Sequence, residues 1–584
     1  MPNRNPEDRI LDHLTFLYGA PRAAECFTRL RRRLDLFRSQ HPELHRSAAP
    51  AERLSEDDVI LITYGDQLRE PGPAPLQTLA DVLNTTLGGV VGGVHILPFY
   101  PYSSDDGFSV IDYLAVDPEL GEWDDLAPLQ ANYRLMFDAV INHISAQSEW
   151  FQAFLRGEPG AEARFIDIDP ATDLALVTRP RTHPLLTPFE TPNGTAYIWT
   201  TFSADQIDLN YANTDVLLEV VDALLLYVER GAELIRLDAI GYLWKEIGTR
   251  CIHLPQTHRV VQLIRAVLDI VAPQVLLITE TNVPHQDNIS YFGDGANEAQ
   301  LVYQFPLAPL VLDAFAGGSA RHLTEWAADL APPSSSTAFF NFLASHDGIG
   351  VVPASGILSQ EEVGALVERT KAHGGHVSYK TNPDGSQSPY ELNITLFDAL
   401  SDPSGDEPQE RKVDRFVAAH AIMLALQGVP GLYVHSLVGS HNYHAGVEQT
   451  GRARSINREK WQRADFEQRL SDPHGHEHAV FERMAALIRT RRSERAFHPS
   501  GRQRILALGD GAFSLLRSSP DGREHVLCIQ SVLNGAQRLV VDSLPDLRGP
   551  IARDLLGGDA TVADDRITVE LAPYQVCWLK WKIA

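Results

Sequence analysis

The stretch Gly-Ala-Glu-Leu-Ile-Arg-Leu-Asp-Ala-Ile-Gly at residues 231–241 decides how the rest of the sequence is interpreted. Leu234 and Ile235 are typical of the end of a buried strand. Arg236 and Asp238 fall on the same side of that strand, because strand side chains alternate with a period of two. A lone arginine beside a carboxylate is most often a structural ion pair. A catalytic role becomes the better interpretation only if other strand ends also carry acids.

Short apolar runs of this kind recur along the chain, and most are separated by room for an amphipathic helix, as at residues 215–230, 260–270 and 411–425. The predicted strands lie near residues 59–64, 93–97, 135–141, 234–237, 275–278, 301–303, 338–342 and 431–434. Eight strands in alternation with helices predict a (β/α)8 (TIM) barrel. In such a barrel the strand carboxyl ends and the loops after them form the active face.

The barrel is predicted to span residues 56–498, with a smaller domain on either side. The helical spacing of apolar residues within residues 1–55 predicts a helical extension with a packing role. Residues 499–584 alternate polar and apolar side chains between Gly, Asp and Pro turns, which predicts a C-terminal antiparallel β domain. Two insertions, at about 145–210 and 355–408, are too long for simple barrel loops. We expect these loop-inserted subdomains to shape the substrate pocket.

Composition narrows the possible partners. The 584 residues are 44% hydrophobic and carry a formal charge of −26, which argues against binding to nucleic acid or to an anionic membrane. An anionic small substrate stays possible, because a few arginines can reverse the field inside one pocket. Four scattered cysteines without C-x-x-C spacing predict neither a disulfide framework nor a zinc site. The absence of a signal peptide and of any run of 18 apolar residues predicts a cytoplasmic protein.

Polar residues follow several of the predicted strands. The third strand leads into Asp138 and then Asn142-His143, the fifth ends in Glu280, and the seventh leads into His346-Asp347. Together with Asp238 these side chains would converge on one pocket at the active face. Burying so many acids without a task would be costly, so the sequence predicts an active site there.

Four blocks, D-x-x-x-N-H, R-L-D-A, an apolar strand ending in Glu, and H-D-G, resemble in this order those of the α-amylase superfamily (glycoside hydrolase family 13). A narrower resemblance, from about residue 57 to the C-terminus, is to the sucrose phosphorylase subfamily. It includes the segments Ile96-Leu97-Pro98-Phe99, Asp105-Asp106-Gly107-Phe108, Arg179-Pro180-Arg181, Arg236-Leu237-Asp238-Ala239-Ile240-Gly241-Tyr242 and His346-Asp347-Gly348-Ile349-Gly350-Val351.

The chemistry of glycosyl transfer fits the same residues. A retaining enzyme needs two carboxyl groups about 5–5.5 Å apart, one as nucleophile and one as acid/base. Asp238 is the predicted nucleophile, since a cation beside it should lower its pKa and keep it ionised. Glu280 ends an apolar strand, where its pKa can be raised, and is the predicted acid/base. The resemblance implies that Asp347 stabilises the oxocarbenium-like transition state.

Further roles are implied by the resemblance alone. The residues expected to hold sugar hydroxyls are Asp105, His143 and His346. Aromatic rings around the glucosyl unit are expected from Phe108, Phe202 and Tyr242, and Gln206 is expected to line the pocket. Asp138 and Asn142 are expected to be scaffold residues. The mechanism requires no metal ion and no organic cofactor.

A phosphorylase must bind an anion against a background of carboxylates, so it needs local cations, preferably arginines. One candidate set, Arg179 and Arg181, lies in the first insertion. The other set, Arg452, Arg454 and Arg458, follows the eighth strand. Loop arginines commonly face solvent, but these match family positions on the active face. We therefore predict that Arg181 and Arg458 bind phosphate or the acceptor.

On the side of the leaving group the sequence departs from sucrose phosphorylases. The second residue after the acid/base is Asn282 where the subfamily usually has His, and the stretch containing Tyr390 and Glu391 also differs. This pattern is more similar to the branch typified by glucosylglycerate phosphorylase, whose acceptor carries a carboxylate. Arg452 and Arg454 would suit such an acid.

The predicted reaction is the reversible, retaining phosphorolysis of glucosylglycerate to α-D-glucose 1-phosphate and D-glycerate, with inorganic phosphate as co-substrate. Alternatives within the class are phosphorylases of sucrose, sucrose 6'-phosphate or glucosylglycerol. A hydrolase or transglucosidase is a second possibility, and a catalytically inactive barrel with a binding or assembly role is a third. A monomer or a homodimer is expected.

Overall fold

The computed structural model describes residues 5–46, 52–382, 385–541, 553–557, 560–563 and 566–582. Its centre is a closed barrel of parallel strands in the order β1-β16-β12-β11-β10-β9-β4-β3. The barrel strands are β1 (Ile60–Thr63), β3 (Gly93–Ile96), β4 (Arg134–Ala139), β9 (Ala232–Leu237), β10 (Leu276–Thr279), β11 (Leu301–Tyr303), β12 (Ala338–Phe342) and β16 (Val429–Tyr433). Each overlaps one of the predicted apolar runs, so the predicted (β/α)8 barrel is confirmed.

Helices surround the barrel because their apolar sides need a partner. Helix α6 shows this clearly: Asn213 caps its first turn by accepting a hydrogen bond from the Asp215 amide, and ten of its residues are buried. The longer barrel helices are α3 (Pro75–Thr86), α6 (Thr214–Glu229), α7 (Pro255–Val271), α9 (Leu307–Gly317), α13 (Gln409–Ala425) and α17 (His476–Arg492). Shorter ones are α4 (Ala127–Gln130), α8 (His285–Ile289) and α10 (Arg321–Ala328).

Three loop regions build up the active face. The first insertion contains β5 (His143–Ser145), α5 (Glu149–Leu155), β6 (Leu186–Thr191), β7 (Gly194–Trp199) and β8 (Gln206–Asp208). The second contains α11 (Gln360–Ala372), β14 (His376–Thr381), β15 (Gln387–Asn393) and α12 (Leu396–Leu400), and β13 (Ile349–Gly350), just before it, pairs with β15. The chain after β16 forms α14 (Val434–Val438), α15 (His444–Thr450), β17 (Trp461–Gln462), which pairs with β2 (Leu68–Arg69), and α16 (Arg463–Ser471).

Two antiparallel sheets follow the last barrel helix. One has the strand order β18-β19-β20-β25-β22, from β18 (Arg502–Leu506), β19 (Ala512–Ser518), β20 (Glu524–Ser531), β25 (Val576–Lys582) and β22 (Arg553–Asp554). The other has the order β21-β24-β23, from β21 (Gln537–Val541), β24 (Arg566–Leu571) and β23 (Ala560–Ala563). These sheets are consistent with the predicted C-terminal β domain, whereas the boundary at residue 499 stays a prediction.

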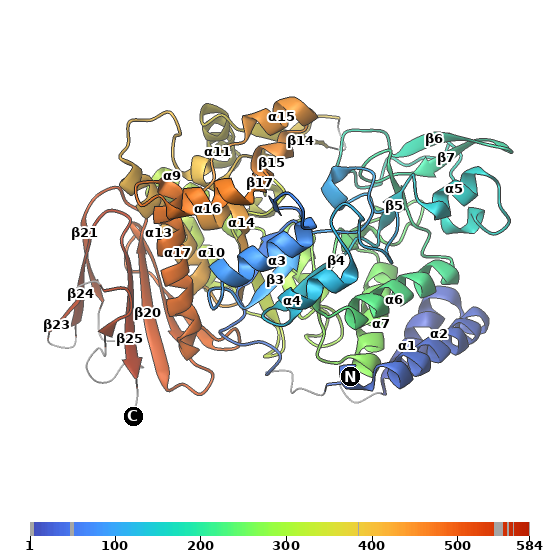
Figure 1. The fold of residues 1–584 in the computed structure, drawn as a ribbon, viewed down its shortest axis with the longest axis horizontal. Helices are drawn as coiled ribbons and strands as arrows, with labels where there is room; N and C mark the ends of the chain where they lie inside the picture. The colour runs from blue at the N-terminus through green and yellow to red at the C-terminus, as the bar shows by residue number, and fades with distance from the viewer. Residues whose placement is uncertain are drawn as a thin grey trace.

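At the other end of the molecule, α1 (Pro6–Tyr18) and α2 (Ala20–Gln40) form a helical hairpin beside α6 and α7 (Figure 1). The predicted boundary at residue 55 stays a prediction. The four cysteines are buried and form no disulfide. Among the described residues, no helix combines the length and the apolar character that crossing a bilayer requires.

Candidate active site

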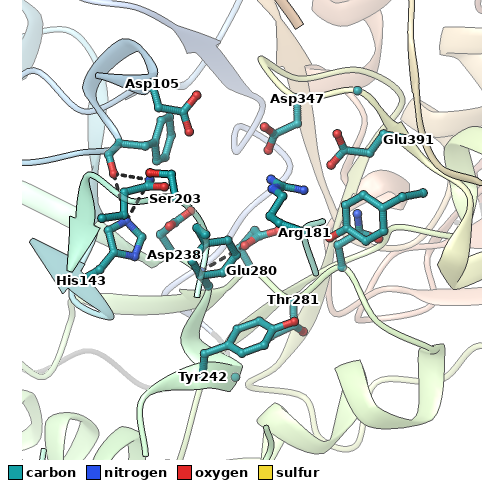
Figure 2. Close-up of a pocket in the computed structure, with 18 of the residues that line it drawn as sticks. Asp105, His143, Arg181, Ser203, Asp238, Tyr242, Glu280, Thr281, Asp347 and Glu391 are labelled. Carbon is teal, nitrogen blue, oxygen red and sulfur yellow. Dashed lines mark hydrogen bonds between the residues drawn. The ribbon is translucent and has the colours of Figure 1, made fainter. Parts of the chain in front are cut away.

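A cavity of about 270 Å³ opens at the carboxyl ends of the barrel strands. All of the predicted site residues line it except Arg236, which lies beneath it, and Arg458, which lines an adjoining space of about 860 Å³ between the insertions. Figure 2 shows the carboxyl groups of Asp238, Glu280 and Asp347 facing a common space, with Arg181 reaching toward it. The predicted residues that line the cavity are Asp105, Phe108, His143, Arg181, Phe202, Gln206, Asp238, Tyr242, Glu280, His346, Asp347, Tyr390, Glu391, Arg452 and Arg454.

Arg236 anchors the floor of this cavity. It is fully buried, and its Nη1 donates hydrogen bonds to the carboxylates of Asp138 and Asp238, the latter at 2.8 Å. Its Nη2 lies 3.9 Å from Glu280. His95 Nε2 approaches the other oxygen of Asp138 at 2.6 Å. The same guanidinium therefore supports Asp138 and faces both predicted catalytic carboxyls.

The turn after β9 directs a backbone donor at Glu280, the predicted acid/base. Ala239 has a left-handed conformation, with φ of 47°, which for a residue other than glycine costs about 1–2 kcal/mol. In this conformation its N–H donates to Glu280 Oε2 at 3.1 Å. The strained turn thus ties the residue directly after the predicted nucleophile to the predicted acid/base.

The prediction that Asp238 has a lowered pKa is wrong. Burial is the strongest influence on this carboxyl and raises its pKa well above the usual value, against the lowering effect of Arg236. Burial also raises the pKa of Glu280. Both carboxyls lie near the Arg236 guanidinium, so they titrate as a pair. Arg236 lies closer to Asp238, at 2.8 Å, than to Glu280, at 3.9 Å, so of the two it stabilises the ionised form of Asp238, the predicted nucleophile, more strongly.

Asp347 has the opposite environment. Burial on its own would raise the pKa of this carboxyl, but Arg454, His346 and Arg458 outweigh burial and lower it. Arg454 Nη1 lies 2.7 Å from Asp347 Oδ1, and His346 Nε2 lies 3.4 Å from Oδ2. Asp347 therefore stays ionised, which its predicted role of stabilising positive charge on a sugar ring requires.

The opposite wall of the cavity combines aromatic rings with neutral polar groups. The rings of Phe108 and His346 stack with centroids 4.7 Å apart. His143 Nε2 donates to the Phe108 carbonyl at 2.9 Å, and Gln206 Nε2 donates to the same oxygen at 2.9 Å. Burial lowers the pKa of His143, so its ring is neutral. A flat apolar ring beside hydroxyl-binding groups is an arrangement that suits a sugar.

The arginines of the active face divide into two groups. Arg454 is held by Glu391, with Nη2 2.7 Å from Oε1, and by Asp347. Arg458 donates from Nη1 to Asp106 at 2.5 Å and from Nε to the His346 carbonyl at 2.8 Å. Arg458 thus braces the loop that carries Asp105, an arrangement that does not favour its predicted role as a phosphate ligand.

Arg181 and Arg452 form the second group. Both line the cavity, and neither has a carboxylate partner among the residues that the structure describes. Arg181 lies over the Tyr390 ring, with 5.4 Å from Cζ to the ring centroid. These two side chains are therefore the cations that an incoming anion can bind without breaking an existing ion pair.

Sequence reasoning missed Asp205, which organises the rim of the cavity. Its Oδ2 accepts hydrogen bonds from Ser103 at 2.6 Å, from Ser109 at 2.8 Å, and from Ser104. The serines flank a turn in which Asp105 and Asp106 both have positive φ values, 55° and 51°. The serine-rich segment is visible in the sequence, but nothing there links it to an aspartate about 100 residues later.

Lys245 was also missed, and it joins the first insertion to the barrel. Its buried ammonium lies 2.6 Å from Asp208 Oδ2 and 3.0 Å from Asn142 Oδ1. Asp208 also accepts hydrogen bonds from the backbone amide and the hydroxyl of Thr201, both at 2.7 Å. The predicted scaffold role of Asn142 agrees with these contacts. Within the described residues, no group of three His, Cys, Asp or Glu side chains is arranged to hold a metal ion.

We expect Lys245→Met to lower the free energy of unfolding by about 3–5 kcal/mol, because the buried Asp208 carboxylate would lose its cation. The measurement is the urea midpoint of unfolding. Lys245→Met with Asp208→Asn should recover part of the loss, since the uncompensated charge is then removed. As a control, Lys371→Met removes an exposed pair with Glu368 and should leave the midpoint nearly unchanged. An unchanged midpoint in Lys245→Met itself would contradict the structural role.

Comparisons with known proteins agree with this geometry. The family model described as the α-amylase catalytic domain matches residues 86–352. Glucosylglycerate phosphorylase from Allomeiothermus silvanus is 51% identical over 99% of this chain and 100% of its own length. The chain belongs to the glucosylglycerate phosphorylase family. The enzyme of that name from Escherichia coli is 45% identical over 98% of this chain and 100% of its own length.

The glucosylglycerate phosphorylase family lies within the α-amylase superfamily, so the resemblance inferred from the sequence motifs is confirmed. Among solved structures, sucrose 6F-phosphate phosphorylase from Thermoanaerobacter thermosaccharolyticum superposes with a TM-score of 0.72 at 26% identity, covering 83% of this chain and 96% of its own. The individual roles of the cavity residues stay predictions that the experiments below address.

Proposed function

We propose that this enzyme is a retaining glucoside phosphorylase that converts glucosylglycerate and phosphate to α-D-glucose 1-phosphate and D-glycerate, reversibly. The observation that carries the proposal is the full-length similarity to enzymes named glucosylglycerate phosphorylase. The cavity supports it, because it holds Asp238 and Glu280 together with two arginines that have no carboxylate partner in the described part of the chain. A cavity of this size suits a single glucosyl unit and a small acceptor.

The first displacement forms a glucosyl-enzyme. An Asp238 oxygen attacks the anomeric carbon while the bond from that carbon to the glycerate oxygen breaks. Glu280 gives its proton to the leaving oxygen, so D-glycerate departs as an alcohol. The positive charge that builds up on the sugar ring is stabilised by the ionised Asp347 and by the aromatic wall that contains Phe108 and His346.

The second displacement has the same groups in reversed roles. A phosphate oxygen attacks the anomeric carbon, the bond to Asp238 breaks, and Glu280 accepts a proton from the phosphate. Two inversions give net retention, and the product is α-D-glucose 1-phosphate. No metal ion or organic cofactor takes part in these steps, and inorganic phosphate is the co-substrate.

Arg181 and Arg452 are the groups that we assign to anion binding. Because phosphate and glycerate both attack the same glucosyl-enzyme, one pair of arginines serves the two anions in turn. Arg454 and Arg458, which Glu391 and Asp106 hold, keep the cavity wall in shape instead. The planar guanidinium suits both a carboxylate and a phosphate.

We expect Arg181→Ala to raise the KM for phosphate about ten- to hundredfold, since hydrogen bonds to a charged group contribute about 1.5–3 kcal/mol. The measurement is initial-rate phosphorolysis at varied phosphate. Attack by water on the glucosyl-enzyme needs no anion site, so the slow release of free glucose should not change. Arg538→Ala, on the C-terminal sheet, is the control. An unchanged KM for phosphate would show that Arg181 does not bind phosphate.

The reaction itself is tested by incubating the enzyme with α-D-glucose 1-phosphate and single acceptors, and by measuring phosphate release. Release with D-glycerate but not with fructose, fructose 6-phosphate or glycerol is the expected result. Release with fructose alone would support a glucoside phosphorylase but contradict D-glycerate as its acceptor. Formation of glucose at a rate independent of phosphate would identify a hydrolase. A cytoplasmic location and a monomeric or homodimeric state complete the proposal.

A further inference from the structure

The helical hairpin of α1 and α2 packs on the two barrel helices that flank the nucleophile strand. Helix α6 leads into β9, which ends in the Arg236-Asp238 segment, and α7 leads into β10, after which Glu280 follows. Both α1 and α2 pack on α7, and α2 also packs on α6 (Figure 1). The hairpin therefore covers the outer side of the part of the barrel that carries both catalytic carboxyls.

Charge pairs fix the hairpin in this position. Arg33 on α2 donates from Nε to both carboxylate oxygens of Asp222 on α6, at 2.9 and 3.0 Å. Arg29 lies 2.6 Å from Asp215 at the start of the same helix. On the other side, Arg9 of α1 lies 2.6 Å from Asp269 of α7. The basic helix α2 thus faces the acidic helix α6, and one further ion pair joins α1 to α7.

Tyr18, the last residue of α1, extends the contact inward. Its hydroxyl donates to the Tyr211 carbonyl at 2.9 Å, and the Tyr211 hydroxyl donates to the Ile141 carbonyl at 2.7 Å. Both tyrosine side chains are buried. Ile141 stands two residues before His143, and Tyr211 stands five residues after Gln206. Since β5 and β8 pair with each other, the two tyrosines secure both strands of the wall that holds His143 and Gln206.

A second contact reaches the neighbouring wall. The rings of Tyr18 and Trp244 lie with centroids 6.3 Å apart. Trp244 follows Tyr242 by two residues and directly precedes Lys245, whose ammonium binds Asn142 and Asp208. Tyr18 is thus in contact with the segments that carry Gln206 and Tyr242, and it is linked through Tyr211 to the segment that carries His143.

We infer that the N-terminal hairpin is a positioning element for the glucosyl half of the cavity, and that Tyr18 and Tyr211 are its positioning residues. The hairpin acts through the backbone of the two strands and makes no contact with substrate. This inference rests on the proposed function, because the affected wall is the one assigned to the glucosyl unit.

The first test removes single hydroxyl groups from the full-length chain. Tyr18→Phe and Tyr211→Phe should each raise the KM for glucose 1-phosphate about three- to tenfold, as expected for one lost buried hydrogen bond on the binding path. The KM for glycerate, measured at saturating glucose 1-phosphate, should stay the same. Tyr133→Phe is the matched control. Its hydroxyl also donates to a buried carbonyl, that of Leu83 at 2.8 Å, on a part of the barrel remote from the cavity.

The control separates positioning from general stability. All three variants lose one buried tyrosine hydrogen bond and should lose similar thermal stability. If Tyr133→Phe raised the KM for glucose 1-phosphate as much as Tyr18→Phe did, the inference would be overturned. An unchanged KM in both Tyr18→Phe and Tyr211→Phe would overturn it as well.

A charge swap tests the docking of the hairpin itself. Arg33→Asp should raise the KM for glucose 1-phosphate, because it places like charges on α2 and α6. Arg33→Asp with Asp222→Arg restores an opposite pair and should bring the KM back toward that of the unmodified enzyme. Failure of the swap to restore a raised KM would show that Arg33 acts in another way, and the docking mechanism would fall.

Hydrogen exchange distinguishes a failure of this inference from a failure of the proposed function. Backbone amides at residues 141–145 and 206–211 should exchange faster in Tyr18→Phe than in Tyr133→Phe, whatever the substrate is. An enzyme without glucose 1-phosphate activity but with this difference would refute the proposed function alone. Equal exchange in the two variants would refute the positioning role.

Discussion

Asp238→Asn is expected to stop glucosyl transfer, with kcat falling by roughly four to six orders of magnitude. An amide oxygen is too weak a nucleophile to displace glycerate or phosphate from the anomeric carbon, so no glucosyl-enzyme forms. The fold should persist, because an asparagine oxygen can still accept the 2.8 Å hydrogen bond from Arg236. The measurement is phosphate release from glucose 1-phosphate with D-glycerate as acceptor.

Two further measurements test whether the loss of activity is due to the loss of the nucleophile. The Kd for glucose 1-phosphate should change by no more than a few-fold, since Asp105, His143 and the aromatic wall are intact. Mass spectrometry after rapid quenching should find the covalent glucosyl-enzyme in the unmodified protein and not in Asp238→Asn. A variant that kept even about one hundredth of the activity, or that still formed the covalent species, would assign the nucleophile to another residue.

The sequence predicted the barrel because fully buried parallel strands leave a strong trace. Runs such as residues 59–64 and 275–278 are apolar on both faces, and each overlaps a barrel strand in the structure. The position of the site then follows from topology, since acids at the carboxyl ends of neighbouring strands must meet at one face. Topology therefore places Asp238, Glu280 and Asp347 in one pocket, whereas the predicted role of Asp347 rests on the family resemblance.

The properties of individual side chains could not be predicted in the same way. Whether an arginine is available to a substrate depends on carboxylates far away in the chain, as Arg454 with Glu391 and Arg458 with Asp106 show. The pKa of Asp238 depends on how deeply the cavity is enclosed, and Arg236 alone was a misleading guide to it. Pairings over such distances leave no local pattern in the sequence.

The helical hairpin at the N-terminus illustrates the same limit. Its helical spacing was visible, and a packing role was the natural expectation. The hydrogen bonds from Tyr18 to Tyr211 and from Tyr211 to Ile141 span about 190 and 70 residues of chain. Only the folded structure shows that this packing reaches the strands that carry His143 and Gln206.

Glu280→Gln should separate proton transfer from the rest of the mechanism. With glucosylglycerate as substrate, kcat/KM is expected to fall about 10²- to 10⁴-fold, the usual contribution of a general acid. Glutamine keeps an oxygen that can accept the hydrogen bond from the Ala239 amide, so the geometry of the turn should be retained. What is lost is the proton that the alkoxide of glycerate needs in order to leave.

A substrate that needs no such proton provides the decisive comparison. With α-glucosyl fluoride the leaving group is a stable anion, so formation of the glucosyl-enzyme by Glu280→Gln should be slowed far less. Asp238→Asn must lose activity on both substrates, because the nucleophile is needed whatever leaves. Equal losses on both substrates in Glu280→Gln would mean that this residue binds the sugar and does not donate the proton. The ratio of the two losses therefore measures the acid role of Glu280 independently of the protein's stability, since both rates come from the same preparation.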